Sequence, residues 1–461
     1  MEEYKSYDEY KESGIEWLGY VPKKWNLVKF KYLFSYQKGN SPNKYTNKNN
    51  GVPYLSMDYL RDNEEEIMYV KNDSNMAEIK PNQILLLWDG SNSGEFIKSK
   101  YGLLSSTMAV INSLELNKEF SYYWFKSSEK YIKDQTIGMG IPHVDSKILK
   151  NLYITVPSKK EQQKIALFLD QKKAKIDKII NKKENLIEKL KEYKKSVITE
   201  AVTKGKLEDK YINEDGELVD EIEMKDSGVE WIGKMPTFIN SVKIKRLTQI
   251  KRGASPRPID NPVYFDENGE YSWVRISDVT SSDDYLLETE QTLSELGASK
   301  SVKMDKGDIF LSIAATIGKP IITKIKCCIH DGFVYFPEYK GNKKYLFYIF
   351  KSEQPYKGLG KHGTQINLNT TIVGNIKIPY FSHENQKRIS KYLDCKTKQI
   401  NKLIQRTKES IEKYTEYKKS LIFEAVTGKI DLRDYEVKEG EDSVKYDNTR
   451  KVEGESLSRV N

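Results

Sequence analysis

The chain has 461 residues, a length that suggests about three domains at roughly 150 residues each. It carries 76 Lys plus Arg against 67 Asp plus Glu, a formal net charge of +9, and 38% of its residues are hydrophobic. This composition excludes a disordered polyelectrolyte, and no apolar run approaches the roughly 20 residues that a membrane helix needs. Because the start also lacks the regions of a secretory signal, we expect a folded protein in the cytoplasm.

Metal-based chemistry is not expected in this chain. Three cysteines cannot form a disulfide framework, and the four histidines, which we expect at the surface or in turns, show no zinc-binding spacing. Cys327 and Cys328 lie in an apolar run that is typical of a buried strand.

An internal repeat organises the chain from its start. The sequence Ser-Gly-Ile-Glu-Trp-Leu-Gly at 13–19 recurs as Ser-Gly-Val-Glu-Trp-Ile-Gly at 227–233, an offset of 214. The same offset carries Lys-Gly-Asn-Ser-Pro at 38–42 onto Arg-Gly-Ala-Ser-Pro at 252–256. Later in each copy the offset is 224, as for Glu-Ala-Val-Thr at 200–203 and 424–427. The chain is therefore predicted to be two copies of one unit whose middles have diverged.

Each copy has two parts of different character. Short apolar or β-branched runs between turn signals predict mixed α/β domains over residues 22–158, the first head, and 236–382, the second head. Each head is followed by a stretch without Gly or Pro that is rich in Lys, Glu, Ile and Leu, which predicts long spacer helices over 159–206 and 383–430. The remaining parts are an N-terminal segment (1–21), a linker with the repeated segment (207–235) and a tail expected to be disordered (431–461).

The two helices are predicted to pair with each other. A helix of about 40 residues is about 60 Å long, too long for one small domain to bury. Their apolar residues recur every three, four or seven positions, as in a coiled coil, and two copies related by a pseudo-two-fold axis would pair antiparallel. The fold class is therefore α+β, with two heads joined by an antiparallel coiled coil. The predicted seam comprises Ile165, Leu169, Ile176, Ile179, Leu186, Leu190, Val197, Ile389, Leu393, Ile400, Leu403, Tyr414 and Leu421.

The first helix carries an uneven charge, because residues 159–206 hold 15 Lys against 7 Asp plus Glu. Two interpretations stay open, namely a solvated lysine face on an exposed helix and an electrostatic contact with nucleic acid.

The chain lacks the motifs of the enzymes that modify or cleave nucleic acid. It contains no G-x-G-x-x-G loop and no Walker-type phosphate loop, and the Asn-Pro-Pro-aromatic motif of adenine methyltransferases is approached only by Asn-Pro-Val-Tyr at 261–264. No repeated acidic cluster offers a magnesium site. We therefore expect neither catalysis nor a bound cofactor in this chain.

The remaining signals are those of a DNA-binding protein. Basic residues stand beside Gly39 and Gly253 at matched places, where a glycine would let the backbone approach a phosphate, although plain turns at the start of each head explain them equally. Reading base edges requires Arg, Lys, Asn or Gln side chains. The candidate DNA-binding residues are Lys38, Asn40, Asn43, Lys44 and Asn92 in the first head and Arg252, Arg257, Arg275, Lys361, Gln365 and Asn367 in the second.

On these motifs the sequence resembles the specificity subunits of type I restriction-modification enzymes. The resemblance covers about residues 10–430 and rests on the duplicated Ser-Gly-Ile/Val-Glu-Trp-Leu/Ile-Gly segments, on the helix starts at 161–166 and 384–389, and on the helix ends at 200–205 and 424–429. It implies two target-recognition domains that each read one half of a bipartite, gapped DNA site, and a coiled coil that sets the gap.

The resemblance also implies the partners. Two modification subunits, which bind S-adenosylmethionine and methylate adenine, and two ATP-driven, magnesium-dependent restriction subunits would complete the enzyme. They would dock on the helices and their flanking segments, so part of the apolar face would meet a partner helix. The subunit itself would have no catalytic activity. The alternatives are a standalone DNA-modifying or DNA-cleaving enzyme and a coiled-coil assembly protein.

Overall fold

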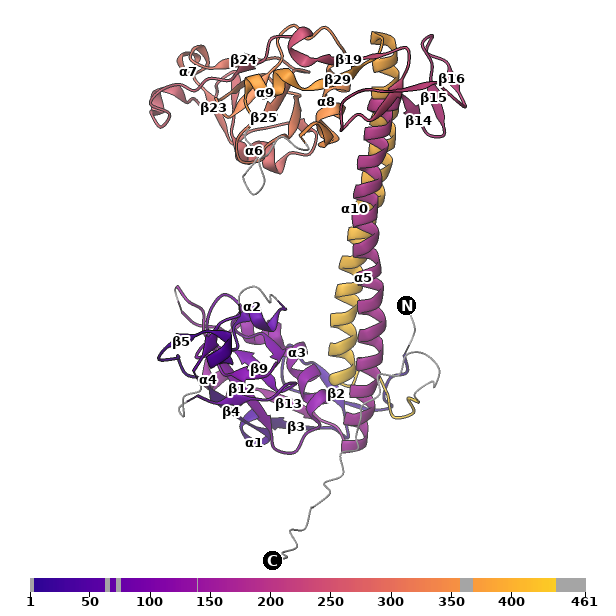
Figure 1. The fold of residues 1–461 in the computed structure, drawn as a ribbon. Helices are drawn as coiled ribbons and strands as arrows, with labels where there is room; N and C mark the ends of the chain where they lie inside the picture. The colour runs from indigo at the N-terminus through magenta and orange to yellow at the C-terminus, as the bar shows by residue number, and fades with distance from the viewer. Residues whose placement is uncertain (1–3, 63–66, 72–75, 139, 357–367, 437–461) are drawn as a thin grey trace, which may run out of the picture. The chain divides into compact units, whose positions relative to one another are not determined.

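The computed structural model describes residues 4–62, 67–71, 76–138, 140–356 and 368–436. The chain divides into two compact units, unit 1 with residues 1–182 and 411–461 and unit 2 with residues 183–410. Each unit contains one head and a part of both long helices (Figure 1). Among the helices of the described ranges, none combines the length and the apolar character that a bilayer crossing demands.

The first head is built on a four-stranded antiparallel sheet. Its strand order is β10 (Phe96–Lys98), β9 (Ile84–Leu87), β12 (Met108–Ser113) and β4 (Phe34–Lys38), so that β4 forms one edge. Smaller sheets join β3 (Asn26–Lys29) to β13 (Tyr153–Val156), β8 (Glu78–Ile79) to β11 (Gly102–Leu103), and β5 (Tyr45–Thr46) and β6 (Val52–Pro53) to β7 (Tyr69–Val70). The helices are α1 (Phe30–Leu33), α2 (Met57–Leu60), α3 (Lys118–Asp134) and α4 (Ser146–Asn151).

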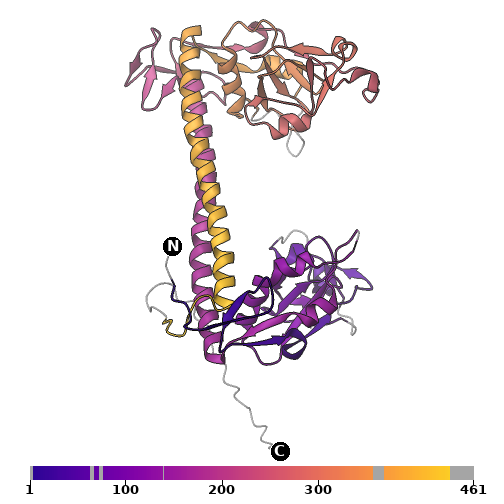
Figure 2. The same cartoon turned by 180° about the vertical axis from the view of Figure 1, so that it is seen from behind.

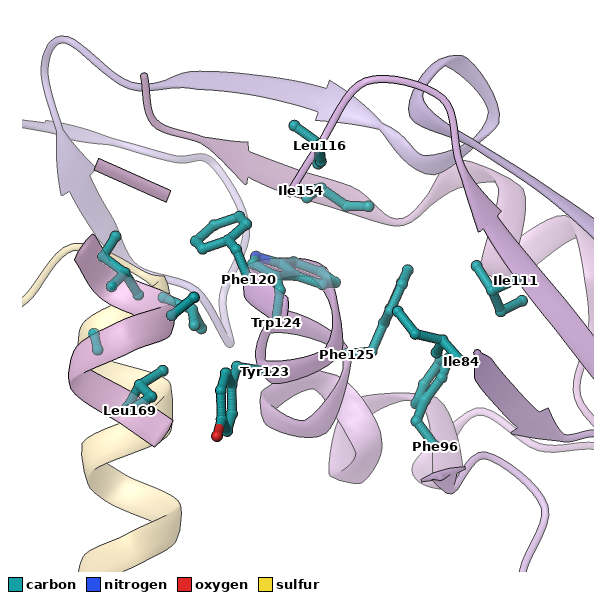
Figure 3. Packing of buried hydrophobic residues seen from close by; sticks show 14 of the residues in the cluster. Ile84, Phe96, Ile111, Leu116, Phe120, Tyr123, Trp124, Phe125, Ile154 and Leu169 are labelled. Carbon is teal, nitrogen blue, oxygen red and sulfur yellow. The ribbon is translucent and has the colours of Figure 1, made fainter. Parts of the chain in front are cut away.

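Helix α3 forms the centre of the core of unit 1. Phe125 points from α3 toward Ile84, Phe96 and Ile111 of the sheet, while Tyr123 faces the long helix (Figure 3). The Phe96 and Phe125 rings stack with their centroids 4.6 Å apart. The sheet and the long helix therefore share one apolar core through α3, because its side chains face both.

The second head is built on two mixed sheets. The five-stranded sheet has the order β20 (Lys251–Arg252), β28 (Phe333–Tyr335), β25 (Ile309–Ser312), β26 (Pro320–Thr323) and β22 (Tyr285–Leu286). The four-stranded sheet has the order β23 (Gln291–Leu293), β21 (Tyr271–Val274), β27 (Cys327–Ile329) and β24 (Val302–Met304). The pairs β21·β27 and β22·β26 are parallel. The helices are α6 (Ile276–Ser281), α7 (Glu295–Ser299), α8 (Lys343–Lys351) and α9 (Thr370–Asn375), and β19 (Asn240–Lys243) pairs with β29 (Lys377–Tyr380).

The residues that repeat in sequence form the same strand pairs in both units. In unit 1, β1 (Tyr10–Glu12) pairs with β2 (Tyr20–Pro22), with Tyr10 opposite Pro22. In unit 2, β17 (Met224–Asp226) pairs with β18 (Lys234–Pro236), with Met224 opposite Pro236. Tyr10 and Met224, like Pro22 and Pro236, are separated by the offset of 214 found in the sequence.

The repeated helix-start segments make the same hydrogen bonds in both units. The side-chain Oε1 of Gln162 accepts from the backbone N of Asn117 at 2.8 Å, and its Nε2 donates to the carbonyl O of Pro157. Gln386 does the same with Asn342, at 2.7 Å, and with Phe381. Each glutamine therefore joins its long helix to the start of α3 or α8, which explains why the repeat retains it.

The long helices are α5 (Lys159–Lys204) and α10 (His383–Val426). They lie side by side within each unit (Figures 1 and 2). In unit 1, Lys418 Nζ lies 2.7 Å from Asp177 Oδ1, and in unit 2, Lys194 Nζ donates to Asn401 Oδ1 at 2.9 Å. In unit 1, Thr155, just before α5, donates to the carbonyl O of Val426 at the end of α10, so the two helices run in opposite directions there.

Most of the predicted seam residues face inward, but two of them do not. Ile165, Leu169, Ile176, Ile389, Leu393, Ile400 and Leu421 are buried, and Ile179, Leu190, Val197 and Tyr414 are half-buried. The prediction was wrong for Leu186 and Leu403, which are 46% and 49% exposed. Their neighbours Ile187 and Ile404 are buried in their place. Because apolar residues stand in adjacent pairs here, the spacing fits two phases one residue apart, and the sequence does not choose between them.

Two predicted connecting segments are structured where the sequence suggested otherwise. In the predicted linker, β14 (Lys206–Leu207), β15 (Lys210–Ile212) and β16 (Leu218–Val219) form an antiparallel sheet. The tail was predicted to be disordered from 431, but Asp431 N donates to the carbonyl O of Lys5, and Tyr435 Oη donates to Gln171. Residues 431–436 therefore pack onto unit 1, while the rest of the predicted tail lies outside the described residues.

Candidate nucleic-acid interface

In the first head, the candidate residues Lys38 and Asn40 flank Gly39 where edge strand β4 ends. A Cβ added at Gly39 would lie 2.2 Å from the carbonyl O of Ser105, so the close approach of two backbone segments requires glycine here. The Nζ of Lys38 lies 3.1 Å from Asp89 Oδ2 and over the Trp88 ring. The lysine is exposed at the sheet edge and is held there by one carboxylate.

The second head repeats this turn at the end of edge strand β20. A Cβ added at Gly253 would lie 2.2 Å from the carbonyl O of His330, as at Gly39. The exposed Arg252 donates from Nε to the carbonyl O of Asp331. Close packing against a facing backbone segment requires glycine at both positions, a reason that neither of the two sequence-based explanations included.

Asp331 organises the polar groups of the second turn. Its Oδ1 accepts from Ser255 Oγ at 2.9 Å, and its Oδ2 lies 3.3 Å from Arg257 Nη2. Burial alone would raise the pKa of Asp331, but the Ser255 hydrogen bond and the charges of Arg252 and Arg257 hold it below its usual range. The carboxylate is therefore ionised at neutral pH.

The two turns correspond residue by residue. Ser41 Oγ in the first head donates to Ser106 Oγ at 3.1 Å, at the place where Ser255 donates to Asp331 in the second. Ser106 and Asp331 stand at equal distances before β12 and β28. The two heads therefore share a backbone frame, but the acid faces the basic residue from different loops, because Asp89 follows β9 whereas Asp331 precedes β28.

Arg275 lies at the same end of the second head as His330. Parallel strands β21 and β27 place Val274 opposite Ile329, so the residues that follow, Arg275 and His330, leave the four-stranded sheet at the same end. His330 lies in the turn before β28, and burial lowers its pKa, with Arg252 acting in the same direction and Asp331 against it. The structure thus brings together two of the predicted arginines, Arg252 and Arg257, around Asp331, whereas Arg275 directly precedes α6, where its backbone N donates to Asp278.

The remaining candidates are dispersed or outside the description. Asn43 and Lys44 are exposed just before β5, and Asn92 is half-buried in the turn between β9 and β10. Lys361, Gln365 and Asn367 lie outside the described residues.

Sequence reasoning missed the acidic partners Asp89 and Asp331. Both stand before glycine, which signalled a turn and nothing more. Each contacts a basic residue far away in the sequence, 51 residues away for Lys38 and 79 for Arg252. Only strand pairing brings such residues together.

The opposite edge of the second head is acidic. The last strand of the five-stranded sheet is β22, and the residues around it line a cavity of about 1120 Å³. The acidic residues of this cavity are Asp278, Asp283, Asp284, Glu288, Glu290 and Asp394. The five-stranded sheet therefore has Arg252 at one edge and this acid-rich cavity at the other, where Lys351 and Lys344 pair with Asp284 and Asp394.

Within the ranges that the structure describes, no group of three or more His, Cys, Asp or Glu residues is arranged to hold a metal ion. Cys327 and Cys328 are fully buried in β27, which confirms the prediction of a strand core for both.

Comparison with known proteins identifies the family. The family model for the type I restriction modification DNA specificity domain matches it twice, over residues 22–189 and 239–413. The chain is 32% identical over 431 residues to the specificity subunit of the type I restriction enzyme MjaVIII from Methanocaldococcus jannaschii, covering 90% of this chain and 94% of that subunit. The MjaIX specificity subunit of the same organism is 28% identical over 176 residues, 35% of this chain and 40% of its own length.

A solved structure shares the fold. A chain from a study of complex assembly and conformational transition of the type I R-M system superposes with a TM-score of 0.68 at 15% identity, covering 89% of this chain and 99% of that one. With two matched domains and a relative that is similar over nearly its whole length, the chain belongs to the family of type I restriction-modification specificity subunits and carries two recognition domains.

Proposed function

We propose that the chain reads a bipartite duplex DNA target, with one half-site bound by each head and a gap of fixed length between them. The observation that supports this most is the pair of edge-strand turns. They share the Gly39 and Gly253 backbone contacts but present different side chains, Lys38 beside Asp89 in one and Arg252 beside Asp331 in the other. One frame with two sets of polar side chains is what a protein needs in order to read two different short sequences.

The gap would be set by α5 and α10, paired as an antiparallel coiled coil with the two copies related by a pseudo-two-fold axis. The contacts Asp177–Lys418 and Lys194–Asn401 support this, because the offset of 224 converts each pair into the other. A paired helix resists bending, and a fixed spacing requires that rigidity.

The chain would act without catalytic activity of its own, in a complex located in the cytoplasm. Two modification subunits that bind S-adenosylmethionine and two restriction subunits that use ATP and magnesium would supply the chemistry, so that no cofactor binds this chain. Exposed apolar residues on the helices, Leu186 and Leu403 among them, are suited to contact such partners.

The test is selection from a random duplex library by the intact chain assembled with its modification subunit. We expect a consensus of two short blocks separated by a constant number of unspecified base pairs, with an affinity that falls steeply as salt rises. A library without a gapped consensus would contradict the proposal. Methylation or cleavage by the isolated chain would favour a standalone enzyme, and a purified complex without DNA affinity would favour a pure assembly protein.

A further inference from the structure

Arg252 is restrained in a way that leaves one edge of its guanidinium exposed. Its Nε donates to the main-chain carbonyl of Asp331, and the side chain lies at the surface. Among the described residues, neither of its terminal nitrogens, Nη1 and Nη2, has a hydrogen-bond partner. The contact fixes the plane of the group and leaves a two-pronged donor edge for a ligand.

That edge matches one base in particular. An arginine can donate two parallel hydrogen bonds to O6 and N7 of guanine in the major groove, and no other base presents two acceptors there. Because Nε is already bound to the backbone, the side chain loses less conformational freedom when it engages the base.

The neighbouring carboxylate does not compete for this edge. The Oδ1 of Asp331 is occupied by Ser255, and its Oδ2 by Arg257, whose side chain is 74% exposed. Asp331 thereby holds two arginines beside each other, although their like charges repel. Two cations therefore surround one anion, which favours an anionic partner such as DNA.

The charge of the rest of the head agrees with this orientation. The arginine-bearing strand β20 and the acidic surroundings of β22 lie at opposite edges of one sheet. DNA would be repelled from the acidic edge and attracted to the arginine-bearing one.

The first head has no equivalent arginine held by a backbone carbonyl at this turn. Lys38 stands where Arg252 stands, and an ammonium group is a point charge without a planar fork. Ser106 replaces Asp331, and the one arginine within 22–158, Arg61, is paired with Glu95.

We propose that Arg252 determines specificity by reading a guanine in the half-site of the second head, and that Asp331 is a positioning residue that orients it. This inference rests on the proposed function of the chain as a reader of a gapped DNA target.

The experiment compares Arg252→Lys with wild type in selections from a random duplex library, using the intact chain with its modification subunit. Lysine keeps the charge but loses the fork, so we expect guanine preference to fall by about 5- to 150-fold at one base pair, the discrimination of a bidentate contact. The other half-site and the gap should stay unchanged. The matched control is Arg246→Lys, the same change at an exposed arginine of the same head that makes no hydrogen bond or ion pair with the described residues.

Asp331 orients Arg252 through its main-chain carbonyl, and its side chain holds that turn through Ser255 and Arg257. The role of this side chain is tested by Asp331→Asn, which removes the ion pair with Arg257 but keeps a side-chain acceptor for Ser255. We expect a smaller, few-fold loss of guanine preference at the same base pair, whereas a general structural defect would weaken binding to all sequences alike. An Asp331→Asn protein that binds every sequence more weakly with an unchanged preference would overturn the positioning role.

Two results would overturn the reading role of Arg252. One is a half-site of the second head without any G·C pair. The other is an Arg252→Lys protein whose affinity changes equally for all sequences, which would assign Arg252 to a phosphate. A wild-type selection without any gapped consensus would instead contradict the proposed function itself.

Discussion

The two heads share a backbone frame and differ in the chemistry placed on it. At both edge-strand turns a glycine Cβ would lie 2.2 Å from a facing carbonyl oxygen, so both turns tolerate only glycine. Beside those glycines one head has a lysine paired with an acid from the β9 loop, and the other has an arginine held by the turn before β28. A recognition surface can therefore change its side chains while the strands that carry it stay the same.

The repeated tryptophans give the largest expected difference between the units. Trp17 contacts three aromatic rings, including Tyr131 stacked at 5.4 Å, whereas Trp231 lines an open cavity and donates to the carbonyl O of Lys377. We expect Trp17→Ala to lower the free energy of unfolding of unit 1 by about 3 kcal/mol, and Trp231→Ala to lower that of unit 2 by about 1 kcal/mol. Hydrogen–deuterium exchange measures each unit separately, and equal losses would refute the difference.

A repeated tyrosine gives a smaller difference. Tyr123 donates to Asp170 at 2.5 Å, and Tyr348 donates to Asp394 at 2.9 Å, but Asp394 also pairs with Lys344. Burial raises the pKa of Asp170 even with its hydrogen bond from Tyr123, so this carboxylate depends on its donor. We expect Tyr123→Phe to lower the free energy of unfolding of unit 1 by about 2 kcal/mol, and Tyr348→Phe to lower that of unit 2 by about 1 kcal/mol. Hydrogen–deuterium exchange during chemical denaturation measures both losses. A larger cost for Tyr348→Phe would contradict the role given to Lys344.

The contacts between the helices give the smallest difference, and it depends on pH. Burial alone would raise the pKa of Asp177, but hydrogen bonds from Lys173 and Lys418 hold that pKa below its usual range. The unfolded state therefore binds its proton at a higher pH, so the stabilisation is present above about pH 4 and disappears as the pH falls further. We expect Asp177→Asn to lower the free energy of unfolding by about 0.5 kcal/mol at pH 7 and to leave it unchanged near pH 2.

The second unit offers the matched change for this contact. Asn401, opposite Lys194, is the repeat equivalent of Asp177. Asn401→Asp should therefore raise the free energy of unfolding by about 0.5 kcal/mol at pH 7, and this gain should disappear near pH 2. Denaturation curves at the two pH values measure both variants, and a pH-independent effect would rule out the ion pair as the cause.

Much of the fold could be predicted from the sequence, because repeated sequence segments and helix-favouring composition are local signals. The repeat located both heads, and the Gly- and Pro-free stretches located α5 and α10 nearly to the residue. The phase of the seam around Leu186 and Leu403 could not be predicted, because adjacent apolar pairs satisfy two phases equally. The sheet after α5 was missed because its strands have only two or three residues.

At the candidate site, the sequence predicted the basic residues but not their acidic partners. Lys38 and Arg252 could be selected because they flank repeated glycines. Asp89 and Asp331 could not, since an Asp-Gly pair signals only a turn and the contact depends on strand pairing.

Replacement of residues 22–158 by a second copy of 236–382 tests most directly whether each head reads its own half-site. Both segments follow the same strand pair and end beside the same helix start, so the exchange preserves the frame. Library selection with the assembled complex should return a target whose two half-sites are both that of the second head, with the gap unchanged. A folded chimera that still selects the wild-type target, or that changes both half-sites, would contradict the account.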